Sequence, residues 1–190
     1  MQLLPVLKPA RWDGLANGAV AHVWVGTPSE PVVVVAYAWS SDEGLSYVTE
    51  QSEEFPSRDA MVRQAFDNLE LYHTDLEVVE SAGGRMLVSA GRAFAAERIL
   101  CQSHMLRAHE KLEAAEILVS IPRRGAMLAS ALECSDEVKQ TMVKLHAESW
   151  ADVSTDAEHI IDELIIVKDG RKSGTVPVAD AHGAPHPLWA

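Results

Sequence analysis

The chain has no long uninterrupted hydrophobic run, although 47% of its 190 residues are hydrophobic. A membrane-spanning helix needs about 20 consecutive apolar residues, and charges or prolines interrupt every apolar segment here. The apolar start at residues 3–7 is broken by Pro5, and its positive charges, Lys8 and Arg11, follow it. An export signal has the opposite order of charge and apolar core. The sequence therefore predicts a cytoplasmic protein with no membrane partner.

Cysteine is scarce, and this excludes two kinds of stabilising site. Cys101 and Cys134 are the two cysteines of the chain, and they lie outside any Cys-x-x-Cys spacing. A disulfide framework or a zinc site built on thiolates needs several cysteines at short, regular spacings. We therefore expect both residues to be reduced thiols.

Basic residues are outnumbered, with 16 Lys and Arg against 28 Asp and Glu and a net charge of −12. Proteins gain affinity for nucleic acid mainly from clustered Lys and Arg, so a nucleic-acid partner is not expected. The charge is uneven: residues 42–80 hold eleven acids and two bases, whereas residues 85–124 hold seven bases and four acids. An acidic surface of this kind favours a protein partner of opposite charge.

Motifs for covalent catalysis and for nucleotide cofactors are also missing. The chain has no Gly-x-Ser-x-Gly elbow, and neither cysteine lies beside a basic residue at a predicted helix start, where its pKa would fall. Gly83, Gly84 and Gly91 lack the spacing that wraps backbone amides around phosphates, so we interpret them as turn residues. No cofactor is expected.

Short runs of β-branched and aromatic residues recur along the chain and predict strands. Gly83 and Gly84 allow the positive φ of a tight hairpin, and Asp169-Gly170 suits a type I′ turn. We expect strands at residues 19–25, 32–39, 45–49, 76–79, 85–89, 117–121, 126–132 and 164–167.

Three segments predict helices. Ser57 and Ser135 offer side-chain oxygens as N-caps for two of them, and residues 93–112, mostly good helix formers without Gly or Pro, should form the longest. The expected fold is α+β: a mixed or antiparallel sheet with about three packed helices in a single domain at residues 15–172. We expect an N-terminal extension at 1–14 and a flexible tail at 173–190, where prolines and glycines disfavour order.

Five motifs also follow one another in a recognisable order: Leu-Ser-Tyr-Val-Thr at 45–49, Ala-Phe-Asp-Asn-Leu at 65–69, the Gly83-Gly84 hairpin, Phe-Ala-Ala-Glu-Arg-Ile-Leu at 94–100, and Ile-Leu-Val-Ser-Ile-Pro-Arg-Arg at 117–124. Over roughly residues 30–170 this order resembles the YtpQ-like family of conserved bacterial proteins of unknown function. The resemblance implies an α+β fold and a cytoplasmic location, and it implies no activity. In similar proteins an acidic residue is expected where this chain has Ala95, and Asn and Asp where it has Arg123 and Gly125.

Two groups of histidines and acids are candidate metal ligands. His104 and His109 lie five residues apart, which places them about 140° apart on a helix, unlike the i, i+4 pair of a zinc-binding helix. A second group contains His159, Asp156, Glu158, Asp162 and Glu163. It has no calcium-loop pattern, so we interpret it as a solvated loop leading into a strand. No metal site is predicted.

The arginines after the predicted strand at 117–121 are the candidate anion site. Arg123 and Arg124 follow the strand end, where loops often carry function, and a guanidinium binds a carboxylate or phosphate with two hydrogen bonds. We add Arg92 and Arg98 to this site. The alternative is that these arginines form surface ion pairs with the acids of residues 42–80, which would contribute little.

Two functional hypotheses follow. The missing catalytic motifs and the acidic surface predict a non-enzymatic protein-interaction or adaptor module with a protein partner. The alternative is a binding protein for a small anionic ligand, or an enzyme, with its site near Arg123 and Arg124 and with Arg92, Glu97 or His104 contributing. The alternative requires a concave pocket that contains these side chains.

Overall fold

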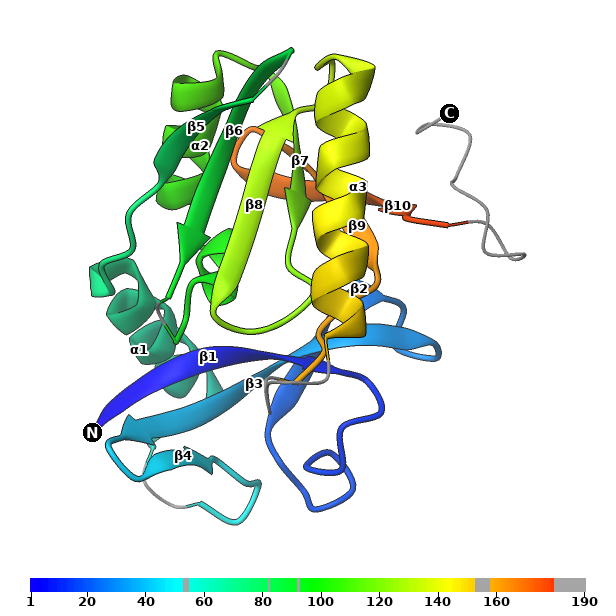
Figure 1. The fold of residues 1–190 in the computed structure, drawn as a ribbon. Coiled ribbons are helices and arrows are strands. Elements are labelled where there is room, and N and C mark those ends of the chain that lie inside the picture. Colours follow the sequence, from blue (N-terminus) through cyan, green and yellow to red (C-terminus); the bar gives the residue numbers. More distant parts are fainter. Residues whose placement is uncertain (53–54, 82, 92, 153–157, 180–190) are drawn as a thin grey trace. The chain divides into compact units, whose positions relative to one another are not determined.

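The computed structural model describes residues 1–52, 55–81, 83–91, 93–152 and 158–179. The chain folds into two compact units, Met1–His73 and Thr74–Ala190, each with its own antiparallel sheet (Figure 1). One α-helix of the described residues belongs to the first unit and two belong to the second. The predicted α+β fold with three helices is therefore confirmed, while the predicted strands are divided between two sheets.

The first unit is built around one long strand. Its elements are β1 (Gln2–Pro9), β2 (Ala21–Gly26), β3 (Pro31–Ser41), β4 (Gly44–Tyr47) and α1 (Arg58–Leu71). β3 pairs with β1 along one edge, and with β2 and then β4 along the other. α1 begins after Ser57, whose Oγ accepts a hydrogen bond from the amide of Ala60 at 3.2 Å, as the N-cap prediction requires.

β1 occupies residues that the sequence places in an N-terminal extension. Six consecutive residues of β1 are buried, so the strand has no alternation of polar and apolar positions and gives no period-two signal. Pro5 lies within it, and a proline is tolerated there because β1 is an edge strand that pairs with β3 alone among the described residues. The boundary expected at residue 15 is not a structural boundary.

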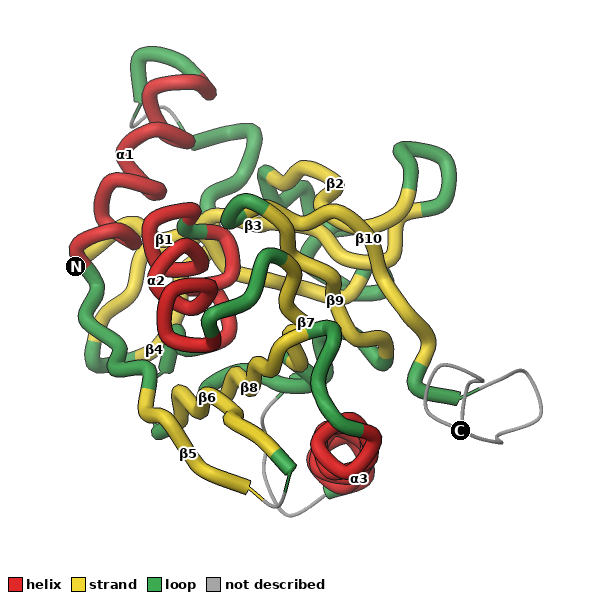
Figure 2. The backbone as a smooth tube through the Cα atoms, turned by 90° about the horizontal axis from the view of Figure 1, so that it is seen from above, coloured by secondary structure: helices red, strands yellow, loops and turns green. Residues whose placement is uncertain are grey.

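The second unit is a six-stranded antiparallel sheet between two helices. Its elements are β5 (Glu77–Ser81), β6 (Gly84–Ala90), the short 3₁₀ helix η1 (Ala96–Leu100), α2 (Gln102–Leu112), β7 (Glu116–Ser120), β8 (Ala126–Ala131), α3 (Asp136–Ala151), β9 (Glu163–Lys168) and β10 (Arg171–Pro177). The strand order is β10-β9-β7-β8-β6-β5. Figure 2 shows α2 and α3 on opposite faces of this sheet, and both helices contact β6 and β8.

Residues 93–112 do not form one continuous helix. Cys101 has an extended backbone (φ −92°, ψ 109°) and separates η1 from α2, so that α3, with 16 residues, is the longest helix. The guanidinium of Arg98, which is fully buried, donates to Cys101 Sγ at 3.4 Å. Burial of this polar side chain is a tertiary constraint, and helix propensity alone does not reveal it.

The C-terminal hairpin extends beyond its predicted end. Asp169 (φ 51°) and Gly170 (φ 73°) both have positive φ, as the predicted type I′ turn requires. The returning strand β10 pairs with β9 as far as Pro177, and Val176 is buried in the core. Residues 173–177 of the predicted tail are therefore ordered, and residues 180–190 lie outside the described part of the chain.

Among the residues that the structure describes, no helix combines the length and the apolar character needed to cross a membrane.

The turn at Gly170 gives the first prediction. A Cβ at Gly170 would lie 2.8 Å from the backbone oxygen of Gln102, at a φ that L-residues disfavour, so we expect Gly170→Ala to lower the free energy of unfolding by about 1–3 kcal/mol. The matched control is Gly174→Ala, whose Cβ would meet Ile166 Cδ1 at 3.8 Å. Urea denaturation measures both; equal stability of the two variants would contradict the prediction.

Candidate functional site

Arg123 connects the loop after β7 to the end of α3 and to the segment that leads into β9. Its Nη2 donates to the carbonyl oxygen of Trp150 at 3.0 Å and lies 2.8 Å from Nε2 of His159. Arg123 and His159 also form an isolated backbone bridge, and Arg123 is buried. These contacts give the guanidinium a role in holding three segments of the second unit together.

Arg124, the next residue, contacts η1 and not α3. Its Nε lies 3.4 Å from Oε1 of Glu97, a fully buried carboxylate on η1, and its guanidinium carbon lies 5.2 Å from the ring centroid of Phe94. An ion pair with a buried carboxylate is stabilised by the low local dielectric, and the aromatic face adds a cation–π contact. Arg124 therefore joins the loop after β7 to η1.

Arg98 is one of the largest fully buried side chains of the chain. Besides its contact with Cys101, its Nη2 lies 3.3 Å from Nδ1 of His104. Burial, and to a smaller extent the positive charges of Arg98, Arg107 and Lys111, lower the pKa of His104 to about 3. His104 is therefore neutral at physiological pH and can accept a hydrogen bond from Arg98.

The four arginines of the predicted anion site thus have separate surroundings. Arg123 contacts α3, Arg124 contacts η1, and Arg98, which belongs to η1, contacts Cys101. Arg92 lies outside the described residues. None of the three described arginines lines the pockets that follow. Anion binding by this group remains a prediction without a shared pocket to support it.

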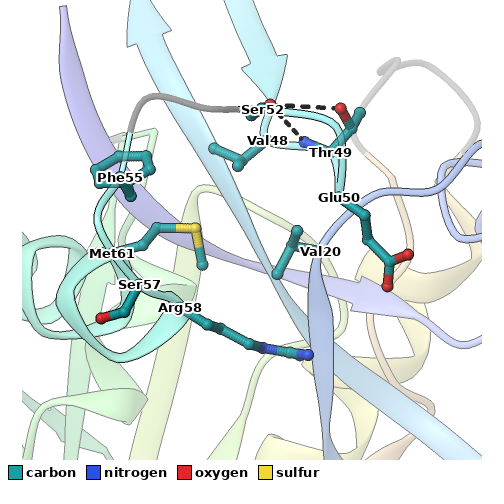
Figure 3. Close-up of a pocket in the computed structure, with 9 residues that line it drawn as sticks. All are labelled: Val20, Val48, Thr49, Glu50, Ser52, Phe55, Ser57, Arg58 and Met61. Carbon is teal, nitrogen blue, oxygen red and sulfur yellow. Dashed lines mark hydrogen bonds between the residues drawn. The ribbon is translucent and has the colours of Figure 1, made fainter.

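A pocket of about 240 Å³ lies in the first unit, between the residues after β4 and the start of α1 (Figure 3). In Figure 3 the side chains of Val20, Val48 and Met61 point toward one another, while Arg58 and Glu50 lie at the edge. The lining residues are Val20, Val48, Thr49, Glu50, Ser52, Phe55, Ser57, Arg58 and Met61. The pocket thus combines apolar side chains with the hydroxyl groups of Thr49, Ser52 and Ser57, and charged groups lie at its edge.

Arg58 gives this pocket its positive charge. Its Nη2 donates to the carbonyl oxygen of Ala21, which fixes the side chain across the unit. Burial, with a smaller effect of the Arg58 charge, lowers the pKa of His22, whose Nδ1 lies 2.9 Å from the hydroxyl of Tyr37. Burial also raises the pKa of Tyr37. Both groups are therefore neutral at physiological pH, so that Arg58 carries the charge beside them.

A cleft of about 330 Å³ lies in the second unit. α3, the start of β9 and the end of β10 contribute its lining residues, which are His146, Ala147, Trp150, Asp162, Glu163, Pro177, Val178 and Ala179. The indole of Trp150 lies between two imidazoles, with centroid distances of 6.4 Å to His146 and 4.3 Å to His159. Arg123 fixes this aromatic group through the Trp150 carbonyl.

His146, which lines this cleft, contacts the buried Ser120 of β7, and neither residue was among the predicted site residues. Nδ1 of His146 lies 2.9 Å from Oγ of Ser120, and burial lowers the pKa of His146 to about 4, although the charge of Asp162 opposes this shift. A serine, a histidine and an acid resemble a hydrolase triad, but Ser120 is fully buried at the end of a central strand. A substrate cannot reach its hydroxyl, so acyl transfer is not supported. The two residues are 26 positions apart with no motif around them.

The histidines among the candidate metal ligands are hydrogen-bonded within the fold. His109 Nδ1 lies 2.8 Å from the carbonyl oxygen of Ala114, and its Nε2 accepts from the amide of Gly170 at 3.3 Å. His159 Nε2 lies 2.7 Å from the carbonyl oxygen of Trp150, and Asp156 lies outside the described residues. Within the described ranges, no group of three or more His, Cys, Asp or Glu residues is placed to hold a metal ion.

Comparison with known proteins finds no family model, no curated protein and no solved structure that matches this chain. The resemblance to the YtpQ-like family therefore remains a prediction.

The buried histidine gives a prediction about pH. Unfolded His146 takes up a proton near pH 6.5, whereas the folded pKa is about 4, so its contribution to stability is complete above pH 6.5 and is lost as the pH falls toward 4. The loss is about 3 kcal/mol by this difference in pKa. His104 contributes a second loss of the same sign.

Urea denaturation between pH 7 and pH 4, followed by NMR signals of the second unit, measures this loss. Between pH 6.5 and pH 4 the unfolded chain binds about one more proton at His146 than the folded chain does. We expect His146→Gln to remove this contribution, so that its unfolding free energy falls less steeply with pH than that of the unaltered chain. The same slope in both proteins would show that His146 does not titrate on unfolding as described.

Proposed function

We propose that this chain is a non-enzymatic protein-interaction module, and that it binds a basic, extended segment of a partner protein along β5. The observation that carries the proposal is the character of β5 as an edge strand. In the described residues β5 pairs with β6 alone, so that one side of its backbone has no neighbouring strand in its unit. Such an edge presents N–H and C=O groups that can pair with an added strand.

The side chains of β5 support this role. Val78 and Val79 are 45% and 43% exposed. Because neighbouring residues of a strand point to opposite faces, apolar surface is available on both sides of this edge. An added strand would cover both valines.

The two edges of the six-stranded sheet differ in a way that favours β5. β10, at the other edge, has a register shift between Lys172 and Gly174 and ends at Pro177. Bulges and prolines are devices that prevent further pairing at an edge. The β5–β6 ladder is regular from Glu77 to Ser81, so β5 keeps the geometry that an added strand needs.

The acidic residues around β5 favour a basic partner. Glu77 and Glu80 flank the two valines, Asp75 precedes them, and the chain as a whole has a net charge of −12. Like charges on adjacent strands repel and opposite charges attract, so acidic segments, including a second copy of β5, are disfavoured. Arg85 pairs with Glu80 at 3.3 Å, but this pair is exposed and contributes little.

A peptide pair tests the proposal. A ten-residue peptide of alternating valine and lysine should shift the backbone NMR signals of β5 and slow amide exchange there, and its affinity should fall with added salt. The matched peptide of alternating valine and glutamate should not bind. Glu77→Lys should lower the affinity for the lysine peptide by about fivefold or more. Glu133 is an exposed acid outside β5, and Glu133→Lys should change this affinity little.

Equal binding of the two peptides would contradict the proposal, as would signal changes located away from β5. A crosslinking pulldown with the intact chain then identifies the partner. A captured protein supports the proposal only if the Glu77→Lys variant no longer captures it.

A second candidate function is binding of a small carboxylic acid in the pocket of Figure 3. It is favoured by one observation: Arg58 lines this pocket together with apolar side chains such as Phe55 and Met61, and it stands at the first turn of α1, where the helix dipole also attracts an anion. This keeps the anionic ligand predicted from the sequence but replaces Arg123 and Arg124 by Arg58.

Benzoate is a suitable probe for that pocket, since its ring can contact Phe55 and Met61 while its carboxylate meets Arg58. We expect benzoate to shift the NMR signals of the lining residues, and we expect Arg58→Met to lower the affinity for benzoate by about tenfold. Arg63→Met, an exposed arginine of α1 outside the lining, is the control. Unchanged signals of the lining residues at saturating benzoate would exclude this function.

A further inference from the structure

The register of β5 on β6 fixes which face of the sheet each β5 side chain occupies. Directly opposite residues of an antiparallel pair carry their side chains on the same face. Val79 lies opposite Met86, and Met86 packs with Val138 of α3 in the hydrophobic core. α3 and α2 lie on opposite faces of this sheet (Figure 2), so Val79 belongs to the α3 face.

Glu80, the next residue of β5, belongs to the α2 face. It lies opposite Arg85, whose Nη1 donates to the carboxylate of Glu113 at 2.9 Å. Glu113 is the residue that caps the C-terminal end of α2. This contact places the pair of Glu80 and Arg85 on the side of the sheet that α2 covers, opposite to Val79.

Residues 77–80 therefore give each face of this edge one glutamate and one valine. Successive side chains of a strand alternate between the two faces, so Val78 shares the α2 face with Glu80. By the same alternation, Glu77 shares the α3 face with Val79. All these side chains are exposed, so an added strand would meet a charged group and an apolar group on both faces.

The two glutamates differ in what neutralises them within the sheet. Glu80 has Arg85 opposite it, and Nε of Arg85 lies 3.3 Å from Oε1 of Glu80. Glu77 has the apolar Val88 opposite it, and within the described ranges it has no ion pair. The charge of Glu77 is therefore available to a cation on an added strand, whereas the charge of Glu80 is shared with Arg85.

We infer that the segment bound by β5 has the order basic–apolar–apolar–basic at the positions opposite residues 77–80, and that the basic residue opposite Glu77 contributes most to binding. Opposite charges and apolar pairs that lie directly across a ladder stabilise strand pairing. The inference rests on the proposed strand addition at β5, and it adds the side-chain pattern by which β5 selects its partner.

A strictly alternating segment satisfies this pattern only in part. Its basic side chains all point to one face and its apolar side chains to the other, whereas β5 needs one of each on both faces. An alternating segment in register with Glu77 and Val78 therefore places a basic residue over Val79 and an apolar residue over Glu80. The order of the residues, and not only their composition, decides the affinity.

Two peptides of identical composition test the pattern with the intact chain. Both carry three threonines at each end; the centre is Lys-Val-Val-Lys in one peptide and Lys-Val-Lys-Val in the other. Titrations followed by the backbone NMR signals of β5 measure both affinities. We expect the Lys-Val-Val-Lys peptide to bind about fivefold more tightly than its isomer, because it matches β5 at every position from 77 to 80.

Variants of β5 test the role of Glu77. Glu77→Gln should lower the affinity for the Lys-Val-Val-Lys peptide about threefold, and Glu80→Gln should lower it less, because Arg85 already pairs with Glu80. Glu77→Lys should also raise the affinity for a matched Glu-Val-Val-Lys peptide, which a general loss of stability would not do. Glu133→Lys, which reverses an exposed charge outside β5, should change neither affinity.

Equal affinity of the two isomers at β5 would overturn the inferred pattern while strand addition at β5 would still hold. Equal losses of affinity in Glu77→Gln and Glu80→Gln would overturn the leading role of Glu77. If neither isomer changed the β5 signals, strand addition itself would be contradicted, and the inference would fall with it.

Discussion

The second unit depends on the position of β7 between β8 and β9. β7 is hydrogen-bonded on both sides, and its apolar residues Ile117, Leu118 and Val119 are fully buried. Because this strand cannot shift without breaking two ladders, Ser120 at its end and Arg123 just beyond it are fixed points. They hold α3 through His146 and the Trp150 carbonyl. The cleft is thus a consequence of core strand pairing.

The same sheet explains why β5 is the proposed interaction surface. An open antiparallel sheet has two edge strands, and the two edge strands of this sheet differ. β10 is interrupted by a register shift and ends in proline, whereas β5 is regular and acidic. Among the described residues, β5, the Arg58 pocket and the α3 cleft are features that a ligand could reach, whereas Ser120 is buried and Arg98, Arg123 and Arg124 are bonded within the fold. We propose that these features serve recognition rather than covalent chemistry.

Local signals predicted much of the fold, and tertiary burial accounts for what they missed. Ser57 and Ser135 accept hydrogen bonds as N-caps, and the Asp169-Gly170 turn has the predicted backbone. β1 gave no signal because six of its residues are buried in succession, and the break at Cys101 depends on burial of Arg98. The contacts of Arg123 and Arg124 could not be predicted from the sequence, because their partners lie tens of residues away, beyond any local pattern.

Strand addition at β5 is tested most directly by interstrand NMR contacts in the complex of the intact chain with the alternating valine–lysine peptide. We expect Hα–Hα contacts between the peptide and β5, which arise when an antiparallel strand is added to the sheet edge. Peptide contacts restricted to β10, to the first unit or to the α3 cleft would contradict it.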